Sequence, residues 1–273
     1  MRGRRQDLGE LAREPFVGPQ PQHGLPALLL VTAVPSSAQL DLPGCARPAR
    51  LVAPFAFVAV NGQCVDLSTF ITPLPVGTGW NLTSHLTLAG SVIDLHVLFD
   101  PDPSVTFTGT TLNPTSAATA YAFLFGLPVV PDLYSSASST LRLSLTSPSG
   151  TTTVANSATY PAFVSGYGTV GAELTNLGVD LGTTPCVASG TAATASCDEG
   201  SASHSFAPTF YDNLEALVTY TQDNALSTAT FSGDVTLDRA AAVTPTPEPS
   251  TLALLGLGFV VIGAARRRRR PAV

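Results

Sequence analysis

The 273-residue chain has 12% charged residues and a formal net charge of −6 at pH 7. Its arginines gather near the two ends, so between Gln39 and Pro249 four arginines stand against sixteen acidic residues, a net charge of about −12. An acidic body without lysine excludes nucleic acid and anionic lipid as partners bound by counterion release. The chain is long enough to bury a substantial core, in one large β domain or in two smaller sandwiches.

The first 38 residues have the layout of a secretory signal peptide. A basic region is followed by an apolar run, Leu25–Val34, and then by the small residues Ser36 and Ala38. This order predicts a signal peptide over residues 1–38 that is cleaved after Ala38. Acidic residues dilute the basic region, so a disordered N-terminal tail is the alternative. The arginines of the basic region are Arg2, Arg4, Arg5 and Arg13.

Four cysteines lie in the part of the chain that would be exported. An even number of cysteines in an exported protein indicates disulfides, and four cysteines allow three pairings. We expect Cys45–Cys64 and Cys186–Cys197, because each pair closes a short loop and would stabilise the fold by roughly 2–3 kcal/mol. A metal site is a poor alternative, since the sequence has no Cys-x-x-Cys motif and no histidine at ligand spacing from a cysteine.

Residues 39–242 contain short apolar and alternating runs separated by turn residues. Leu51–Val60 is an apolar run, Asn61-Gly62 predicts a tight hairpin turn, and Val65–Ile71 is the expected return strand. The later runs alternate between apolar and polar residues, which predicts strands with one apolar face. Their apolar residues are Leu82, Leu86, Leu88, Ile93, Leu95, Val97, Phe99, Val105, Phe107, Tyr121, Phe123, Phe125, Leu141, Leu143, Leu145, Leu177, Val179 and Leu181.

The end of this body predicts one more hairpin, from Leu217–Thr221 and Leu226–Leu237, while Asn213–Val218 is ambiguous between strand and helix. Short strands with Gly and Pro turns at this spacing are typical of two-layer β proteins. The sequence therefore predicts an all-β domain over residues 39–242, a sandwich or a jelly-roll-like body. It shows no repeat of fixed period that would indicate a propeller or a solenoid.

The body carries no recognisable catalytic motif. It has no HExxH, no GxSxG and no glycine-rich phosphate-binding loop. His85 and His96 lie on consecutive expected strands and could approach each other, although two exposed strand histidines are the simpler interpretation. We therefore expect a protein that is not an enzyme and that needs no cofactor and no metal.

Asp100-Pro101-Asp102-Pro103 is the segment most suited to calcium, because two carboxylates on a rigid loop could ligate the ion. The simpler interpretation is a turn between strands, in which proline restricts the backbone and aspartate accepts a hydrogen bond from it. Cys197-Asp198-Glu199-Gly200 is a weaker second candidate.

The chain ends in a short apolar run that stops at five arginines. Residues 243–249 form a Thr/Pro linker that would hold the body off a membrane. Thr251–Ala265 has no charge over fifteen residues. As a helix it would measure about 22 Å, less than the roughly 30 Å of a bilayer core, but snorkelling arginines and local thinning could cover the difference. We predict a transmembrane helix and an Arg-rich cytoplasmic tail over residues 250–273.

The same stretch has a more specific resemblance. Pro247-Glu248-Pro249 is followed by Ser-Thr, by a Leu/Gly-rich apolar run, and by Arg266, Arg267, Arg268, Arg269 and Arg270. This order closely resembles the PEP-CTERM sorting domain, over about residues 245–270. Pro271-Ala272-Val273 after the arginines is a small departure from the pattern. An ordinary tail anchor is the alternative interpretation.

The resemblance implies recognition by exosortase, a membrane-embedded cysteine transpeptidase-like enzyme of Gram-negative bacteria. The Pro-Glu-Pro and the arginines would serve in recognition of the substrate, and cleavage near the Pro-Glu-Pro would convert an inner-membrane precursor into a protein of the cell envelope, surface or extracellular matrix. Such proteins usually come from organisms that make exopolysaccharide. The leading hypothesis is therefore a structural protein of an exopolysaccharide or biofilm matrix.

Two other functions remain open. The first is a carbohydrate- or calcium-binding surface module, suggested by Trp80, Tyr121 and the aspartate–proline loop, since sugars stack on exposed aromatic rings. The second is a secreted hydrolase that uses two of the scattered acidic residues, which would need a defined separation in space.

Overall fold

The computed structural model describes residues 40, 42, 44–47, 51–171, 173–241 and 259. The expected signal peptide, the Thr/Pro linker and, apart from Phe259, the expected membrane helix with its arginines lie outside these residues. Within the described part of the chain, no helix is long and apolar enough to cross a membrane.

The described body consists of β-strands and one short 3-10 helix, η1 (Ser68–Phe70), so the predicted all-β class is confirmed. The strands belong to one continuous sheet. In chain order they are β1 (Phe55–Val60), β2 (Gln63–Asp66), β3 (Thr72–Pro73), β4 (Trp80–Leu88), β5 (Ser91–Asp100), β6 (Ser104–Asn113), β7 (Thr119–Ser147), β8 (Thr151–Ala155), β9 (Val164–Val170), β10 (Glu173–Asn176), β11 (Cys186–Ser189), β12 (Ala193–Gln222) and β13 (Ser227–Arg239).

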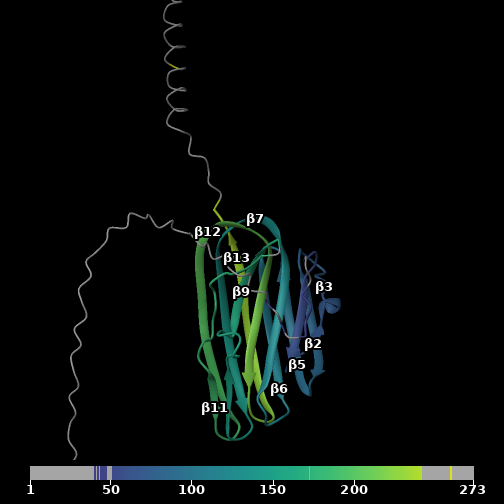
Figure 1. Cartoon of the computed structure of the whole chain (residues 1–273), viewed down its shortest axis with the longest axis vertical. Helices are drawn as coiled ribbons and strands as arrows, with labels where there is room; N and C mark the ends of the chain where they lie inside the picture. Colours follow the sequence, from purple (N-terminus) through teal and green to yellow (C-terminus); the bar gives the residue numbers. More distant parts are fainter. Residues whose placement is uncertain are drawn as a thin grey trace, which may run out of the picture. The chain divides into compact units, whose positions relative to one another are not determined.

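Two very long strands, β7 and β12, fold this sheet into two layers (Figure 1). They pair antiparallel along their whole length, but each half of the pair has different neighbours. The first half of β7 lies beside β1, and its second half lies beside β13. Layer A therefore contains β2, β1, the first half of β7, the second half of β12, β9 and β10. Layer B contains β3, β4, β5, β6, β13, the second half of β7 and the first half of β12.

The two long strands change layer at an irregular corner. Their register shifts between Ser205 and Thr209 and again between Tyr211 and Asn213. Prolines stand at this corner on both strands, at Pro128, Pro131 and Pro208. Proline cannot donate to the ladder and bulges bend a strand, so these residues allow one strand to serve two layers.

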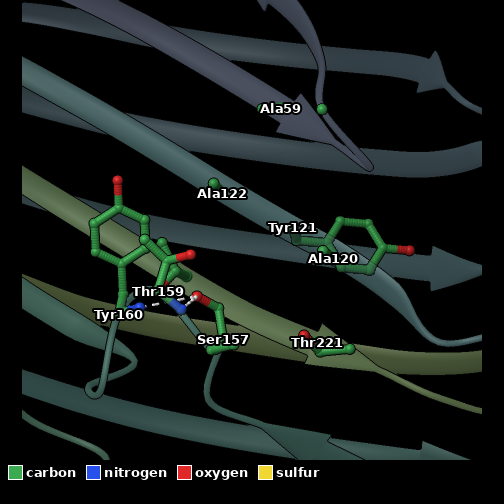
Figure 2. A pocket seen from close by; sticks show the side chains of 11 residues that line it. Ala59, Ala120, Tyr121, Ala122, Ser157, Thr159, Tyr160 and Thr221 are labelled. Carbon is green, nitrogen blue, oxygen red and sulfur yellow. Dashed lines mark hydrogen bonds between the residues drawn. The ribbon is translucent and has the colours of Figure 1, made fainter. Parts of the chain in front are cut away.

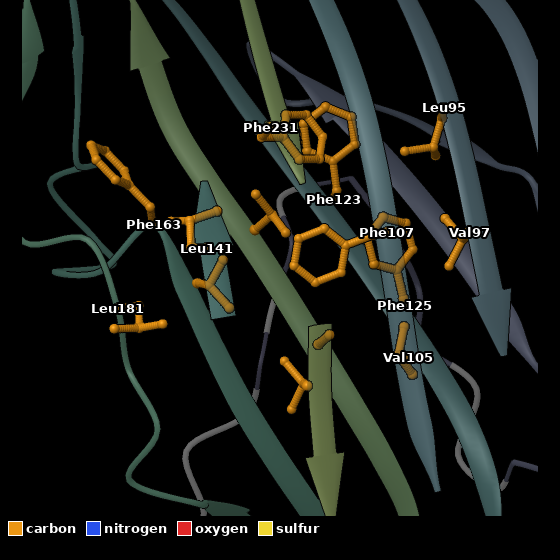
Figure 3. Close-up of a cluster of buried hydrophobic side chains, with 14 of the residues drawn as sticks. Leu95, Val97, Val105, Phe107, Phe123, Phe125, Leu141, Phe163, Leu181 and Phe231 are labelled. Atoms are coloured by element: carbon orange, nitrogen blue, oxygen red, sulfur yellow. The ribbon is translucent and has the colours of Figure 1, made fainter. Parts of the chain in front are cut away.

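The core lies between the layers and is rich in aromatic rings (Figure 3). Phe107 of β6 stacks on Phe125 of β7, with ring centroids 5.8 Å apart. Phe123 of β7 lies 4.9 Å from Phe231 of β13. Each of these pairs joins one layer to the other, and each is worth about 0.5–1.5 kcal/mol beyond the area that it buries.

A strand glycine makes room for one of these rings. Gly109 pairs with Phe231 across the ladder, and a Cβ at Gly109 would lie only 2.3 Å from the Phe231 ring. Gly126 does the same for Phe55, where the separation would be 1.8 Å. Both glycines are therefore required by close packing of a ring on the backbone.

The first predicted hairpin is confirmed, with one correction. Val60 pairs with Gln63 around Asn61-Gly62, whose φ values of 48° and 79° are those of a tight hairpin turn. The return strand was expected to reach Ile71, but it ends at Asp66. The Asp66 carboxylate accepts a hydrogen bond from the backbone N–H of Ser68 (2.8 Å), and this turns the chain into η1.

Two further strand predictions are wrong. Leu177, Val179 and Leu181 are buried in the core as predicted, but they form only a single bridge, between Leu181 and Val164. The expected last hairpin is absent too, because β12 ends in layer A and β13 begins in layer B, where it pairs with β6 and β7. Asn213–Val218, the ambiguous segment, is part of β12.

Both expected disulfides are present. β11 pairs with β8, and β8 pairs with the end of β12, so these two strands extend layer A. Cys186–Cys197 joins β11 to the half of β12 that lies in layer B. It therefore ties the edges of the two layers together. Cys45–Cys64 ties the segment before β1 to β2.

Removal of the inter-layer bridge should weaken the fold without abolishing it. A chain with Cys186→Ala and Cys197→Ala should lose about 3 kcal/mol of unfolding free energy, the entropic contribution of closing a loop of this length. Urea denaturation of the exported, oxidised protein measures this. Ser196→Ala, an exposed neighbour on β12, is the matched control and should change stability by less than about 0.5 kcal/mol. Equal unfolding free energies of the double variant and the control would contradict the stabilising role given to Cys186–Cys197.

Candidate functional site

The outward face of layer B, which we call the hydroxyl face, is a broad polar surface of the described body. Alternate side chains of its strands point into the core, so the remaining ones point outward. Most of these carry a hydroxyl group or a charge. They are Thr83, His85, Thr87, Asp94, His96, Thr106, Thr108, Thr110, Thr140, Arg142, Ser144, Thr146, Ser196, Asp198, Thr228, Thr230, Ser232 and Asp234.

The strand registers arrange these side chains in rows. One row passes through Thr83, His96, Thr108, Ser232, Arg142 and Asp198, one residue from each of six neighbouring strands. At about 4.8 Å between strands, such a row is roughly 24 Å long. The face thus presents rows of hydroxyl and charged groups over a distance of several sugar rings.

Charged groups on the hydroxyl face are largely engaged with polar neighbours. Thr140 Oγ1 donates a hydrogen bond to Asp234, and Arg142 lies 3.9 Å from Asp198. These four side chains border a hollow of about 480 Å³. The hollow gathers two carboxylates, as a hydrolase would require, but each one already has a polar partner.

The two strand histidines lie on the same face but do not form a metal centre. His85 Nδ1 is 2.6 Å from the Asp94 carboxylate, and both side chains are well exposed. His96 lies opposite Thr83 in the next row. Among the described residues, no group of three or more His, Cys, Asp or Glu side chains is arranged to hold a metal ion.

The aspartate–proline loop forms a turn, the simpler of the two interpretations. Asp100 accepts a hydrogen bond from the backbone N–H of Asp102 (3.0 Å). The Asp102 carboxylate pairs with Arg239 (3.0 Å), which also lies 3.4 Å from Asp132. A guanidinium between two carboxylates occupies the position that a cation would need, so the loop gives no support to a calcium site. The second calcium candidate is a β-bulge, in which Gly200 N–H donates to Asp198 (3.1 Å).

Of the two aromatic residues suggested for sugar stacking, Tyr121 is unsuitable. Its ring is 1% exposed in the core, its hydroxyl donates to Ser91 Oγ (2.9 Å), and burial raises the pKa of its phenol. Trp80 is half-buried and packs against the same core. The prediction of an exposed aromatic at Tyr121 is therefore wrong, because the alternation that places Phe123 inward places Tyr121 inward as well.

A different aromatic borders a groove on the outer side of layer A (Figure 2). The groove has a volume of about 260 Å³ and lies over the small side chains of Ala59 and Ala122, with Tyr160 beside it. The loop that carries Tyr160 is shaped by Ser157 Oγ, which accepts hydrogen bonds from the backbone N–H groups of Thr159 (3.2 Å) and Tyr160 (3.0 Å). Sequence reasoning missed this tyrosine because it stands in a loop outside any alternating pattern.

Glu215 is a fully buried carboxylate, and it has a structural role. It points to the outer side of layer A, where Arg47 of the preceding segment covers it and forms an ion pair with it. Burial raises the pKa of Glu215, while the charge of Arg47 opposes this rise. The pair holds the segment around Cys45 against layer A, and it leaves no open space in which a substrate could reach the carboxylate.

The described fold is that of a disulfide-bonded β sandwich suited to conditions outside the cytoplasm. Residues 245–270 match the model of the PEP-CTERM protein-sorting motif. The chain is therefore a protein with a PEP-CTERM signal, which implies export and sorting to the surface by exosortase. The match contains Pro247, Glu248, Pro249 and the five arginines, all outside the described residues. No curated protein matches the chain.

The ion pair makes a pH-dependent prediction. Arg47→Ala leaves Glu215 without its counter-charge, so the pKa of the buried carboxyl should rise further above the ordinary 4.5. Below about pH 4 the Glu215 carboxyl is protonated in both the folded and the unfolded chain, so the variant should be nearly as stable as the parent. As the pH rises above about 4, Glu215 ionises more readily in the unfolded chain than in the folded variant. The loss of unfolding free energy should therefore grow to about 3 kcal/mol at neutral pH.

Urea denaturation of both proteins across this pH range measures the effect. Arg142→Ala, which removes an exposed arginine from a weak surface pair, is the matched control and should show a small loss at every pH. A loss for Arg47→Ala that does not depend on pH would contradict the role given to Glu215.

Proposed function

We propose that this protein is a non-enzymatic structural component of an exopolysaccharide or biofilm matrix. The observation that carries the proposal is the hydroxyl face, on which threonine and serine side chains from five of the six strands stand among charged groups. Hydroxyl groups both donate and accept hydrogen bonds, as the hydroxyls of a polysaccharide do. Many weak contacts along an extended face suit adhesion to a polymer better than they suit turnover of one bond.

The body also has features expected of a protein that persists outside the cell. Two disulfides tie its edges, and its acidic charge keeps it soluble. In the route that we propose, an inner-membrane precursor is held by the apolar run before the arginines. Exosortase then cuts near Pro247-Glu248-Pro249 and releases the body to the envelope or matrix.

The sorting route is tested by changing the signal alone. Glu248→Ala, or deletion of residues 266–270, should leave uncleaved protein in the membrane fraction of cells that contain exosortase, because the recognition elements are missing. Intact mass and fractionation measure this. Deletion of residues 271–273, which lie beyond the matched motif, is the control and should mature like the parent. Normal maturation of Glu248→Ala and of the arginine deletion together would refute the proposed route.

The groove beside Tyr160 favours a second candidate function, a carbohydrate-binding surface module. A half-buried tyrosine ring next to a floor of alanines offers a surface on which a sugar ring can lie. Thr221 and Ser157 also border the groove and could bond to sugar hydroxyls. A secreted hydrolase has less support, because Asp198 and Asp234 are engaged with Arg142 and Thr140.

Substitution of the tyrosine tests this second function. Tyr160→Ala should weaken binding to exopolysaccharide purified from the producing culture by about tenfold, the effect of losing roughly 1–1.5 kcal/mol of stacking. Tyr160→Phe should retain most of the binding, since the ring remains. Phe210→Ala, an exposed aromatic on β12, serves as the control. Equal affinity of Tyr160→Ala and the parent, measured by calorimetry, would exclude the groove as the sugar site.

A further inference from the structure

Layer B ends on both sides in strands whose outer backbone edge has no partner strand among the described residues. The first half of β12, Ala193–Ser205, pairs with β7 on one side only, because β9 and β8 join β12 only from Asn213 onward. At the other side of the layer, β3 pairs with β4 only at Trp80 and Asn81. The remainder of β4, Leu82–Leu88, has no partner strand on its outer edge in the described part of the chain.

Both open edges are long, and their protection is limited to the Asp198–Gly200 bulge with its two carboxylates on β12 and to His85 on β4. An unpaired edge presents backbone N–H and C=O groups that can pair with another strand, and proteins usually block it with proline, lysine or a short strand. Neither Ala193–Ser205 nor Leu82–Leu88 contains proline or lysine. The disulfide between Cys197 and β11 holds the β12 edge in place, so this edge is formed before any partner arrives.

The directions of the strands make the two edges complementary. From β4 through β5, β6, β13 and β7 to β12, each of the six strands is antiparallel to the next. The two outermost strands therefore run in opposite directions. When a second copy is placed beside the first with its hydroxyl face on the same side, its β4 lies antiparallel to β12 of the first copy.

The register of the existing rows predicts which residues would meet. Ser196 belongs to the same row as His85, so an unshifted continuation places Ser196 opposite His85 of the second copy. On the inward side, Ala195 would then lie opposite Leu86. Ala195 and Leu86 are only half-buried in a single copy, although both point toward the core. Pairing of the edges would cover this apolar surface.

Charge favours this combination over pairing of two β12 edges. The β12 edge carries Asp198 and Glu199, and burial, together with the smaller effect of the neighbouring Asp198 charge, raises the pKa of Glu199. Two β12 edges would bring these carboxylates toward those of the other copy. The open part of β4 has no acidic residue, and its one ionisable side chain is His85.

We propose that copies of this protein associate edge to edge, with β12 of one copy against β4 of the next. The contact is head-to-tail, so it leaves one open edge at each end and can be repeated. Repetition would extend the hydroxyl face along the assembly. The importance of this assembly for a matrix rests on the proposed function, whereas the association is a property of the purified protein.

Cysteine cross-linking of the full chain, exported, oxidised and purified in detergent, tests the contact. Ser196→Cys and His85→Cys are made in separate chains at exposed positions, and peptide mapping checks that the neighbouring Cys186–Cys197 bridge is intact. Mixing the two variants under mild oxidation should produce a disulfide-linked dimer that neither variant forms alone. A chain with both substitutions should form a ladder of covalent multimers.

Ser116→Cys, at an exposed position in the loop between β6 and β7, replaces Ser196→Cys in the matched control and should give no cross-link with His85→Cys. Cross-links between two Ser196→Cys chains alone would overturn the proposed pairing in favour of a two-fold β12 contact. Absence of any cross-link, together with a monomeric mass in sedimentation at all concentrations, would overturn the association itself. Maturation by exosortase is assayed separately, so failure of one proposal does not imply failure of the other.

Discussion

The whole fold depends on one hydrogen-bonded pair of strands, β7 and β12. Their ladder runs from Thr119 opposite Gln222 to Ser147 opposite Ala193 and gives both layers a common frame. Side chains alternate along a strand, so a slip of one residue in this pair would turn the inward-facing apolar side chains of the slipped strand outward in both layers. The corner bulges allow the same pair to bend, which brings Phe123 of one layer onto Phe231 of the other.

The links between layer A and the segment before β1 decide which outer surface of the body is covered and which is exposed. Cys45–Cys64 and the Arg47–Glu215 ion pair hold the segment before β1 against the outer side of layer A, and Leu40 and Leu42 pack there with Phe55 and Phe57. No comparable segment among the described residues covers the outer side of layer B. This asymmetry leaves the hydroxyl face exposed and its two edge strands open, and both proposals about the body follow from it.

Several parts of the fold and of the candidate sites could be predicted because their causes are local. Alternation along a strand determined that Leu141, Leu143 and Leu145 face the core, and short loops determined the cysteine partners. Other parts could not be predicted. The sequence around Tyr160 contains no alternating pattern or motif that would single it out. The proposed role of Tyr160 depends on a groove that residues of three strands, distant in sequence, form beside it. Leu177–Leu181 alternates like a strand, but the chain there packs on the core without a continuous partner.

The sequence by itself determined the all-β class, the inward face of most strands, the two disulfides and the sorting motif, because each depends on residues that are close along the chain. Only the tertiary structure decided which strands are neighbours, since pairing in a sheet joins segments that are far apart in sequence and many pairings satisfy the same alternation. It separated the end of β12 from β13, which the sequence had joined in a hairpin, and placed that end of β12 in layer A and β13 in layer B. It also brought threonine and serine side chains from five strands into the hydroxyl face, a surface that no single segment contains.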